Sequence, residues 1–352
     1  MLSLATARQR PYNGSNYYHE WIMKRFFFLF IFTLSLMACD RGDQPKLTHI
    51  TIGTGGLTGV YYPTGQAIAK MINQKTDQHA IKALSESTAG SVYNINNLVE
   101  GEMEFAIAQS DRAYQAWTGE KEWKKLGPQK KLRSLFALHA ETLTLIASKE
   151  SGIVRIQDLK GKRVNLGNLG SGQLGNAEDA LRAFGISLKE IQAEYVKALE
   201  APSLLQDGRL DAFFFMVGHP NGNIKEATNG RNPVKIIPIT GPEVDLLILH
   251  RPYYSRSSVP MHHYPKALNQ EEVRSFGVRA NLLSSESVSE DLAYQLTKAV
   301  FSNLKEFKKL HPALGGLSQE SMLEGLSAPL HPGAIKYYQE ARIPIPRNLL
   351  PK

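Results

Sequence analysis

Two glycine-rich segments each follow a predicted strand, and a predicted helix follows each of them. The segments are Gly53-Thr54-Gly55-Gly56-Leu57-Thr58-Gly59 and Gly167-Asn168-Leu169-Gly170-Ser171-Gly172. Glycine lets a backbone approach a ligand closely, and the first turn of a helix offers unpaired N–H groups and a positive potential. We therefore predict that both loops bind a small anion, although either loop alone could be only a tight turn.

A nucleotide site is the alternative interpretation of the first loop. The dinucleotide fingerprint G-x-G-x-x-G would need glycine where the chain has Thr58, and no acidic residue is cleanly placed about 20 positions later. The lysine of a phosphate-binding Walker motif is missing as well. We therefore expect no nucleotide and no other cofactor.

Further polar residues lie near predicted strand ends, where open α/β sheets usually bind ligands. Ser87–Asn94 places small hydroxyl residues before a helix, where such residues are also common as helix caps. Gln109 ends another strand, and Tyr61 follows the first glycine loop closely enough to cover a ligand. Glu141 follows an apolar segment, and the sequence allows either a buried structural carboxylate or a neighbour of the ligand.

The sequence has no motif of the common hydrolase classes. H-E-x-x-H does not occur, and Ser171 has glycines at 170 and 172 instead of the 169 and 173 that G-x-S-x-G needs. His219, His262 and His263 have no partners at the spacing of metal ligands. We expect no catalysis and no metal site.

Short apolar segments alternate with helical ones, which predicts a largely parallel sheet covered by helices. The predicted strands are 48–53, 80–85, 105–108, 143–147, 163–166, 194–196, 212–215 and 275–283. The predicted helices are 61–74, 91–100, about 173–184, 289–309 and 318–325. The pattern starts again after the first three strands, so two α/β units predict two lobes with a ligand cleft between them.

The strand predicted at 275–283 has a second consequence for the domain organisation. A strand that returns after a second lobe often rejoins the first sheet, which makes the first lobe discontinuous. We therefore expect lobe I to comprise residues 47–147 and 272–352, and lobe II to comprise residues 148–271.

The charge distribution argues against a nucleic-acid partner. The chain has a formal net charge of +8, of which residues 1–39 carry +3. The remaining 37 basic and 32 acidic residues are mostly scattered among one another. A nucleic-acid-binding protein needs a basic stripe, preferably with aromatic residues for stacking, so we expect no nucleic acid to bind.

Residues 23–39 have the pattern of a bacterial export signal, in which a basic head precedes a short apolar segment. The segment is too short for an ordinary transmembrane helix, and its end, Leu36-Met37-Ala38-Cys39, resembles a lipobox. Cleavage before Cys39, the only cysteine, would leave a diacylated N-terminus, and two acyl chains anchor a protein stably. The alternative is an ordinary signal peptide with an incidental cysteine.

The same pattern assigns the other N-terminal residues. We expect Met23 to be the natural start, residues 1–22 to be an upstream extension, and residues 40–46 to be a polar tether. Asp40 after the cysteine favours, by analogy with other bacterial lipoproteins, retention at the inner membrane.

Motifs from about residue 48 to 343 resemble, in order, the TAXI-type solute receptors of tripartite ATP-independent periplasmic (TRAP) transporters. The matching segments are 52–56, 59–65, 88–94, 107–111, 158–164, 170–172, 207–214 and 330–338. The resemblance implies an α/β, two-lobed, type-II periplasmic-binding-protein fold with the ligand cleft between the lobes. It also implies an acidic solute such as glutamate or 2-oxoglutarate.

The matching positions imply a set of ligand contacts. These are Gly55, Gly56, Tyr61, Thr88, Ser91, Asn94, Gln109, Ser171 and Gly172. The chain departs from the family pattern at Gln173, where threonine is common, and at His219, which separates Gly218 from Pro220. Both departures leave the identity of the solute open.

The resemblance also implies the partners. We expect a monomer in the periplasm, anchored by lipid to the inner membrane, that delivers its solute to the subunits of a TRAP membrane permease. A lipid-anchored sensor for a signalling receptor is one alternative, and an enzyme on the same scaffold is another, because a fold does not fix a function.

Overall fold

The computed structural model describes residues 46–351, and residues 47–352 form one compact unit. Cys39, Met23, the upstream extension and most of the expected tether lie outside the described residues. No helix within residues 46–351 is both long and apolar enough to cross a membrane.

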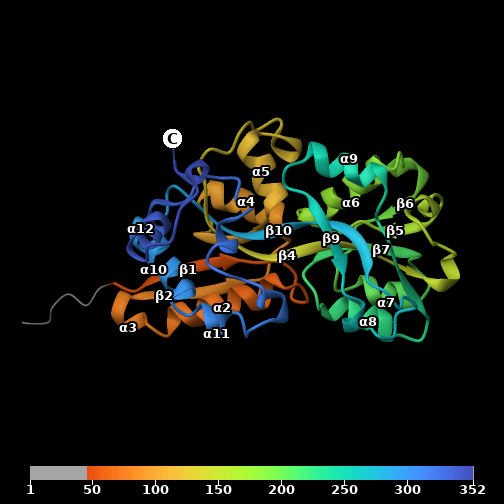
Figure 1. Cartoon of the computed structure of the whole chain (residues 1–352), viewed down its shortest axis with the longest axis horizontal. Coiled ribbons are helices and arrows are strands. Elements are labelled where there is room, and N and C mark those ends of the chain that lie inside the picture. Colours follow the sequence, from red (N-terminus) through yellow and green to blue (C-terminus); the bar gives the residue numbers. More distant parts are fainter. Residues whose placement is uncertain (1–45, 352) are drawn as a thin grey trace, which may run out of the picture. The chain divides into compact units, whose positions relative to one another are not determined.

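Ten strands form one sheet in the order β2-β1-β3-β10-β4-β7-β5-β6, with β8 paired to β4 and β9 paired to β10 (Figure 1). The strands are β1 (Thr48–Gly53), β2 (Ile81–Glu86), β3 (Phe105–Gln109), β4 (Leu132–Ser148), β5 (Arg163–Asn165), β6 (Gln192–Glu194), β7 (Ala212–Val217), β8 (Val234–Ile237), β9 (Ser255–Val259) and β10 (Val273–Ser285).

Helices connect most of these strands and cover the sheet. They are α2 (Tyr61–Asn73), α3 (Thr76–His79), α4 (Ser91–Glu100), α5 (Ser110–Thr118), α6 (Gly172–Ala183), α7 (Ala201–Gln206), α8 (Gly222–Asn229), α9 (Pro242–His250), α10 (Glu290–Phe301), α11 (Leu304–Phe307) and α12 (Pro332–Glu340). Short 3-10 helices lie at Lys121–Trp123, Lys149–Ser151, Ile156–Leu159, Leu188–Glu190, Met261–His263, Pro312–Leu314, Ser321–Leu323 and Arg347–Leu349.

Strands β4 and β10 join two halves of the sheet. The first part of β4 pairs with the second part of β10, which also pairs with β3. The second part of β4 pairs with β7 and β8, while the first part of β10 pairs with β9. We call the half with β1–β3 lobe I and the half with β5–β9 lobe II; Figure 1 shows β4 and β10 running between them. The predicted two-lobed α/β fold is confirmed.

Each lobe has its own apolar core. In lobe I, Ile52 of β1 and Ile68 and Ile72 of α2 are fully buried, as the helical spacing of these apolar residues predicts. In lobe II, Val164 of β5 and Phe214 of β7 are fully buried in a separate cluster. Strand β1 runs in the same direction as β4, whereas β5 runs in the opposite direction. Because the first part of β4 belongs to lobe I and its second part to lobe II, the carboxyl ends of β1 and β5 point toward each other where the lobes join.

The sheet differs from the sequence-based prediction in its centre. The outer strand pairs β1–β2, β1–β3, β5–β6 and β5–β7 are parallel, whereas β4 and β10 are antiparallel to their partners. Only residues 143–147 of β4 were predicted as strand. The helix predicted at 289–309 is divided into α10 and α11, and the one predicted at 318–325 contains only the 3-10 turn Ser321–Leu323.

Candidate functional site: a cavity between the lobes

A cavity of about 480 Å³ lies between the two lobes. Lobe I contributes the first glycine loop, the segment before α4, and the end of β3 to its wall. Lobe II contributes the second glycine loop, the segment after β6, and the end of β7. The lining residues are 55–61, 87–91, 93, 109, 141, 168, 171–173, 197–199 and 215–217. The two glycine loops therefore share one cavity, as their matching positions in the two α/β units predict.

The first glycine loop leaves open space on the cavity side. A Cβ atom built on Gly56 would have no other atom within 4 Å, and one built on Gly55 would contact only the side chain of Tyr61. The N–H of Gly59 donates to the carbonyl of Gly56 at 3.0 Å, which closes a turn just before α2. Helix α2 begins at Tyr61, and no side chain caps its first turn. Its first N–H groups therefore remain available at the cavity.

The second glycine loop contacts lobe I directly. The carbonyl oxygen of Gly170 accepts the N–H groups of Val92 and Tyr93 at 3.1 Å each, so it caps the first turn of α4 across the lobe boundary. The side-chain amide of Asn168 donates to the carbonyl of Ala89 at 3.0 Å. The cavity is thus closed on this side by hydrogen bonds between the second glycine loop and the segment Ser87–Asn94.

The absence of a side chain at Gly172 allows the start of α6 in lobe II to lie against Gln109 and Ser91 of lobe I. A Cβ atom at Gly172 would overlap Oε1 of Gln109 and would lie 2.6 Å from its Cδ and 2.9 Å from Oγ of Ser91. Gln109 is 3% exposed, and its Oε1 has no hydrogen-bond partner among the described residues. Oε1 of Gln109 therefore packs against Gly172 across the lobe boundary, and a larger residue at 172 would force the two lobes apart or turn the amide away.

A buried carboxyl group, Glu141, lies on β4 where the two lobes join. The hydroxyl of Tyr61 donates to its Oε2 at 3.0 Å, and Nε2 of His139 lies 3.7 Å from its Oε1. Burial raises the pKa of Glu141, and His139 and Tyr61 offset only part of this effect. Burial and the neighbouring Glu141 raise the pKa of Tyr61 well above its ordinary value, so its hydroxyl remains a donor.

Comparisons with known proteins identify the family of the chain and support its fold. The sequence pattern of the NMT1-like family matches residues 52–341. The chain belongs to the NMT1-like family. Among solved structures, a protein from Bordetella bronchiseptica RB50 has a TM-score of 0.51 at 15% identity, covering 85% of this chain and 90% of that one. This similarity supports the same fold.

Two more distant structures are similar to this NMT1-like chain. The periplasmic aliphatic sulphonate binding protein SsuA from Escherichia coli has a TM-score of 0.42 at 15% identity, covering 86% of this chain and 96% of its own. An ABC uptake transporter substrate binding protein from Streptococcus pneumoniae with bound histidine has a TM-score of 0.44 at 16% identity, covering 76% and 93%.

The structure of the NMT1-like chain brings together all but one of the nine predicted ligand contacts. Gly55, Gly56, Tyr61, Thr88, Ser91, Gln109, Ser171 and Gly172 line the cavity. Asn94 does not, because its side chain is fully buried behind the wall. Its amide donates to the carbonyls of Thr54 and Ile107 at 2.6 and 2.8 Å and accepts from Oγ1 of Thr88 at 2.7 Å. Asn94 therefore positions the loop that holds Thr88.

Other lining residues were not predicted from the sequence. The sequence left the role of Glu141 open and predicted 212–215 only as a strand, but Phe215 lines the cavity together with Met216 and Val217. Lys197, which is exposed, comes three residues after β6, and the end of that parallel strand was the signal that could have found it.

Of the two departures from the TAXI pattern, Gln173 lies in the cavity wall and His219 lies outside it. Gln173 lines the cavity, but its amide is held by the carbonyl of Phe214 at 2.8 Å. His219 lies outside the lining, where its ring contacts Tyr264 and Thr144. Among residues 46–351, no group of His, Cys, Asp and Glu residues could hold a metal ion.

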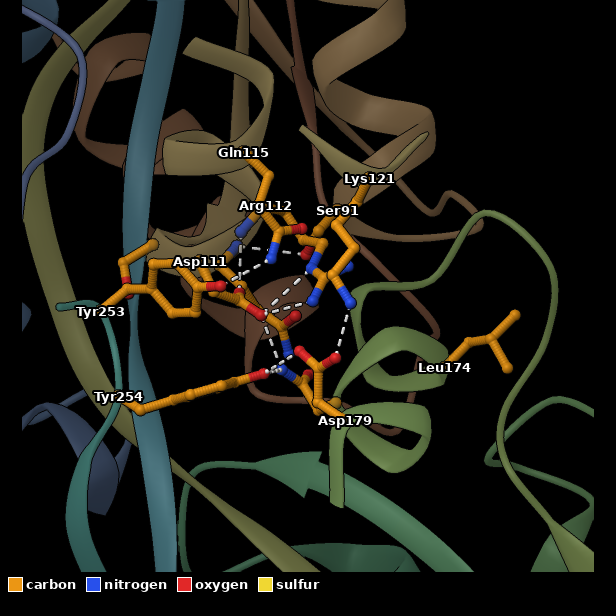
Figure 2. A network of polar contacts seen from close by, with 12 residues as sticks. Ser91, Asp111, Arg112, Gln115, Lys121, Leu174, Asp179, Tyr253 and Tyr254 are labelled. Carbon is orange, nitrogen blue, oxygen red and sulfur yellow. Dashed lines mark hydrogen bonds and ion pairs between the residues drawn. The ribbon is translucent and has the colours of Figure 1, made fainter. Parts of the chain in front are cut away.

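A buried polar network joins the lobes beside the cavity (Figure 2). Asp111, the second residue of α5 in lobe I, accepts from the guanidinium of Arg112 at 2.9 Å and from the amide of Asn176 in α6 at 2.6 Å. The hydroxyl of Tyr254 donates to Asp179 at 3.0 Å, and Lys121 pairs with the same carboxylate at 2.7 Å. Helix α5, which follows Gln109, and helix α6, which begins at Gly172, are therefore also tied together near their starts.

Proposed function

We propose that this NMT1-like protein is an extracytoplasmic solute-binding receptor. In this proposal it captures a small acidic solute, either a glutamate-like amino acid or a dicarboxylate, and delivers it to a TRAP-type membrane permease. One observation carries the proposal: two glycine loops from different lobes line one cavity, and a helix of each lobe begins in its wall.

The electrostatics of the cavity support an anionic solute. Helices α2 and α6 begin in its wall from different lobes, and each of these helix starts carries a partial positive charge of about half a unit. The charged side chains in the wall are Lys197 and Glu141. A volume of about 480 Å³ falls in the range of small-molecule sites, roughly 300 to 1,000 Å³.

The connection between the lobes supports capture by closure. The lobes of the proposal comprise residues 47–147 with 272–352 and residues 148–271, and they are linked through β4 and β10. Bending of these two strands would open and close the cavity, and a solute shifts the equilibrium only if it binds the closed form better. The TRAP partner rests on the sequence resemblance to TAXI receptors. The anchor at Cys39 stays a prediction, which mass spectrometry of the mature N-terminus would test.

Calorimetry of the purified protein tests the function. Titration with L-glutamate, L-glutamine and 2-oxoglutarate should give a saturable heat and a raised melting temperature for at least one of them. Ligand that binds only the folded state stabilises it by about 2.7 kcal/mol at a concentration of 100 times Kd. If no small carboxylate gives either signal, the receptor function is refuted.

A further inference from the structure

We propose that Glu141 determines which class of acidic solute the cavity accepts, because its carboxylate binds the ammonium group of an α-amino acid. The protein would then select amino acids over dicarboxylates. The inference rests on the proposed function and deepens it by naming the solute class. Among the described residues, Glu141 is the only carboxylate in the cavity wall.

The carboxyl group is buried without a firm cationic partner. The residue is 3% exposed, and the hydroxyl of Tyr61 holds Oε2 at 3.0 Å. The only basic group of the described chain within 4 Å is Nε2 of His139, which lies 3.7 Å from Oε1. A buried carboxylate is unfavourable unless a charge of opposite sign and hydrogen-bond donors offset its desolvation. An ammonium group supplies both, since it carries one positive charge and three donors.

The other walls of the cavity suit the rest of an amino acid. The starts of α2 and α6, at Tyr61 and Gly172, present backbone N–H groups, and Lys197 adds a positive charge. These groups favour carboxylates. The cavity therefore has a negative group on the strand between the lobes and positive groups on the loops of both lobes, which is the charge pattern of a zwitterion.

A dicarboxylate would meet a different environment at the same position. The group beside Glu141 would be a ketone oxygen in 2-oxoglutarate and a carboxylate in other dicarboxylates. Either oxygen repels an ionised carboxylate, so Glu141 would have to take up a proton and donate it to the solute. The groups that face Glu141 do not relieve this repulsion. Tyr61 on α2 is a neutral donor, and His139 on β4 offsets only part of the effect of burial on the pKa of Glu141. Asp111 on α5 adds another negative charge that raises this pKa.

The two solute classes therefore differ in the direction of proton exchange. An ammonium group stabilises the ionised form of Glu141, so an amino acid should bind with no proton exchange or with release of a proton to the buffer. A dicarboxylate should bind with proton uptake. Calorimetry in two buffers of different ionisation enthalpy measures this sign on the wild-type protein and needs no variant.

The closing experiment compares L-glutamate with 2-oxoglutarate, which has a ketone where glutamate has the ammonium group. The wild-type protein should bind glutamate at least about tenfold more tightly. Glu141→Gln keeps the shape but removes the charge, and it should weaken glutamate binding by about 30-fold or more, as expected when one partner of a buried charge pair is lost. Binding of 2-oxoglutarate to this variant should stay equal or improve.

A matched control is Glu340→Gln on α12, since Glu340 is exposed and lies outside the cavity wall. This variant should bind both solutes like the wild type.

Three results would overturn the role of Glu141. They are proton uptake with glutamate, a wild-type preference for 2-oxoglutarate, and an unchanged glutamate preference in Glu141→Gln. Equal binding of both acids would also overturn it but would leave the receptor function standing. If neither these nor other small acids bind, both proposals fail.

Discussion

Replacing Gly172 with alanine should weaken solute binding, because the cavity wall has no room for another methyl group. The added Cβ would overlap Oε1 of Gln109 and lie 2.6 Å from its Cδ and 2.9 Å from Oγ of Ser91. Non-bonded carbon contacts are optimal at about 3.5–4.0 Å. Either the buried Gln109 amide turns away from its position or α6 moves back from lobe I.

The expected loss of binding free energy follows from the positions of residue 172 and Gln109 in different lobes. An extra methylene in a well-packed region costs about 1–3 kcal/mol. Gly172 belongs to lobe II and Gln109 to lobe I, so the penalty applies to the closed form and not to a form with separated lobes. Binding that depends on closure should then lose the same free energy, which corresponds to a Kd raised by about 5- to 150-fold. The Tm of the unliganded protein should change less.

The assay is calorimetry with the best solute on Gly172→Ala, beside Gly222→Ala as the control. Gly222 is likewise the first residue of a helix, α8, whose cap is also a side chain, and a Cβ there would meet no atom within 4 Å. Gly222→Ala should keep the wild-type Kd. A wild-type Kd for Gly172→Ala, or equal losses in both variants, would refute the argument that the interlobe contact limits binding.

Three further results are expected. Gly277→Ala should lower the free energy of unfolding, measured by urea denaturation, by about 3 kcal/mol, because the added Cβ would overlap the carbonyl oxygen of Glu141 on the paired strand. A wild-type free energy of unfolding would contradict this. Asn176→Ala should cost about 1–3 kcal/mol in the same assay, because Asp111 loses a buried donor; a change within error would count against the network. Burial lowers the pKa of His219 to about 3, whereas the pKa of histidine in the unfolded chain is about 6.5. The folded state therefore binds fewer protons, and the free energy of unfolding should fall by about 2 kcal/mol from about pH 7 to pH 5. His219→Gln should flatten this pH profile, and an unchanged profile would exclude His219 as its source.

Local patterns predicted the outer parts of the fold well. The strand predicted at 48–53 and the helix predicted at 91–100 have the observed bounds of β1 and α4, because apolar spacing and flanking glycines mark both clearly. The central strand β4 was mostly missed. It is buried on both faces and therefore lacks alternation, and polar residues such as Ser134, His139 and Glu141 interrupt its apolar pattern.

The predicted part of the site is the part that depends on local structure. Glycine loops and helix starts have sequence signals, so Gly55, Gly56 and Gly172 could be chosen without knowledge of tertiary contacts. Glu141 and Phe215 join the wall only because two distant strands pair side by side, with Thr142 opposite Val217. Asn94 was predicted wrongly as a lining residue for a related reason. Its place in α4, near the cavity, follows from local sequence, but its side chain turns away from the cavity because it binds the carbonyls of Thr54 and Ile107.

The buried network and the cavity are connected through two helices. Helix α5 begins directly after Gln109 and carries Asp111, and α6 begins at Gly172 and carries Asn176 one turn later. The hydrogen bond between Asp111 and Asn176 therefore fixes the distance between the two helix starts that face each other at the cavity wall. Because the guanidinium of Arg112 leaves no room for a Cβ at Gly175, α6 cannot approach α5 with a larger residue there. The geometry of the ligand wall is thus set by contacts that the solute itself does not make, and changes in the network should alter affinity as well as stability.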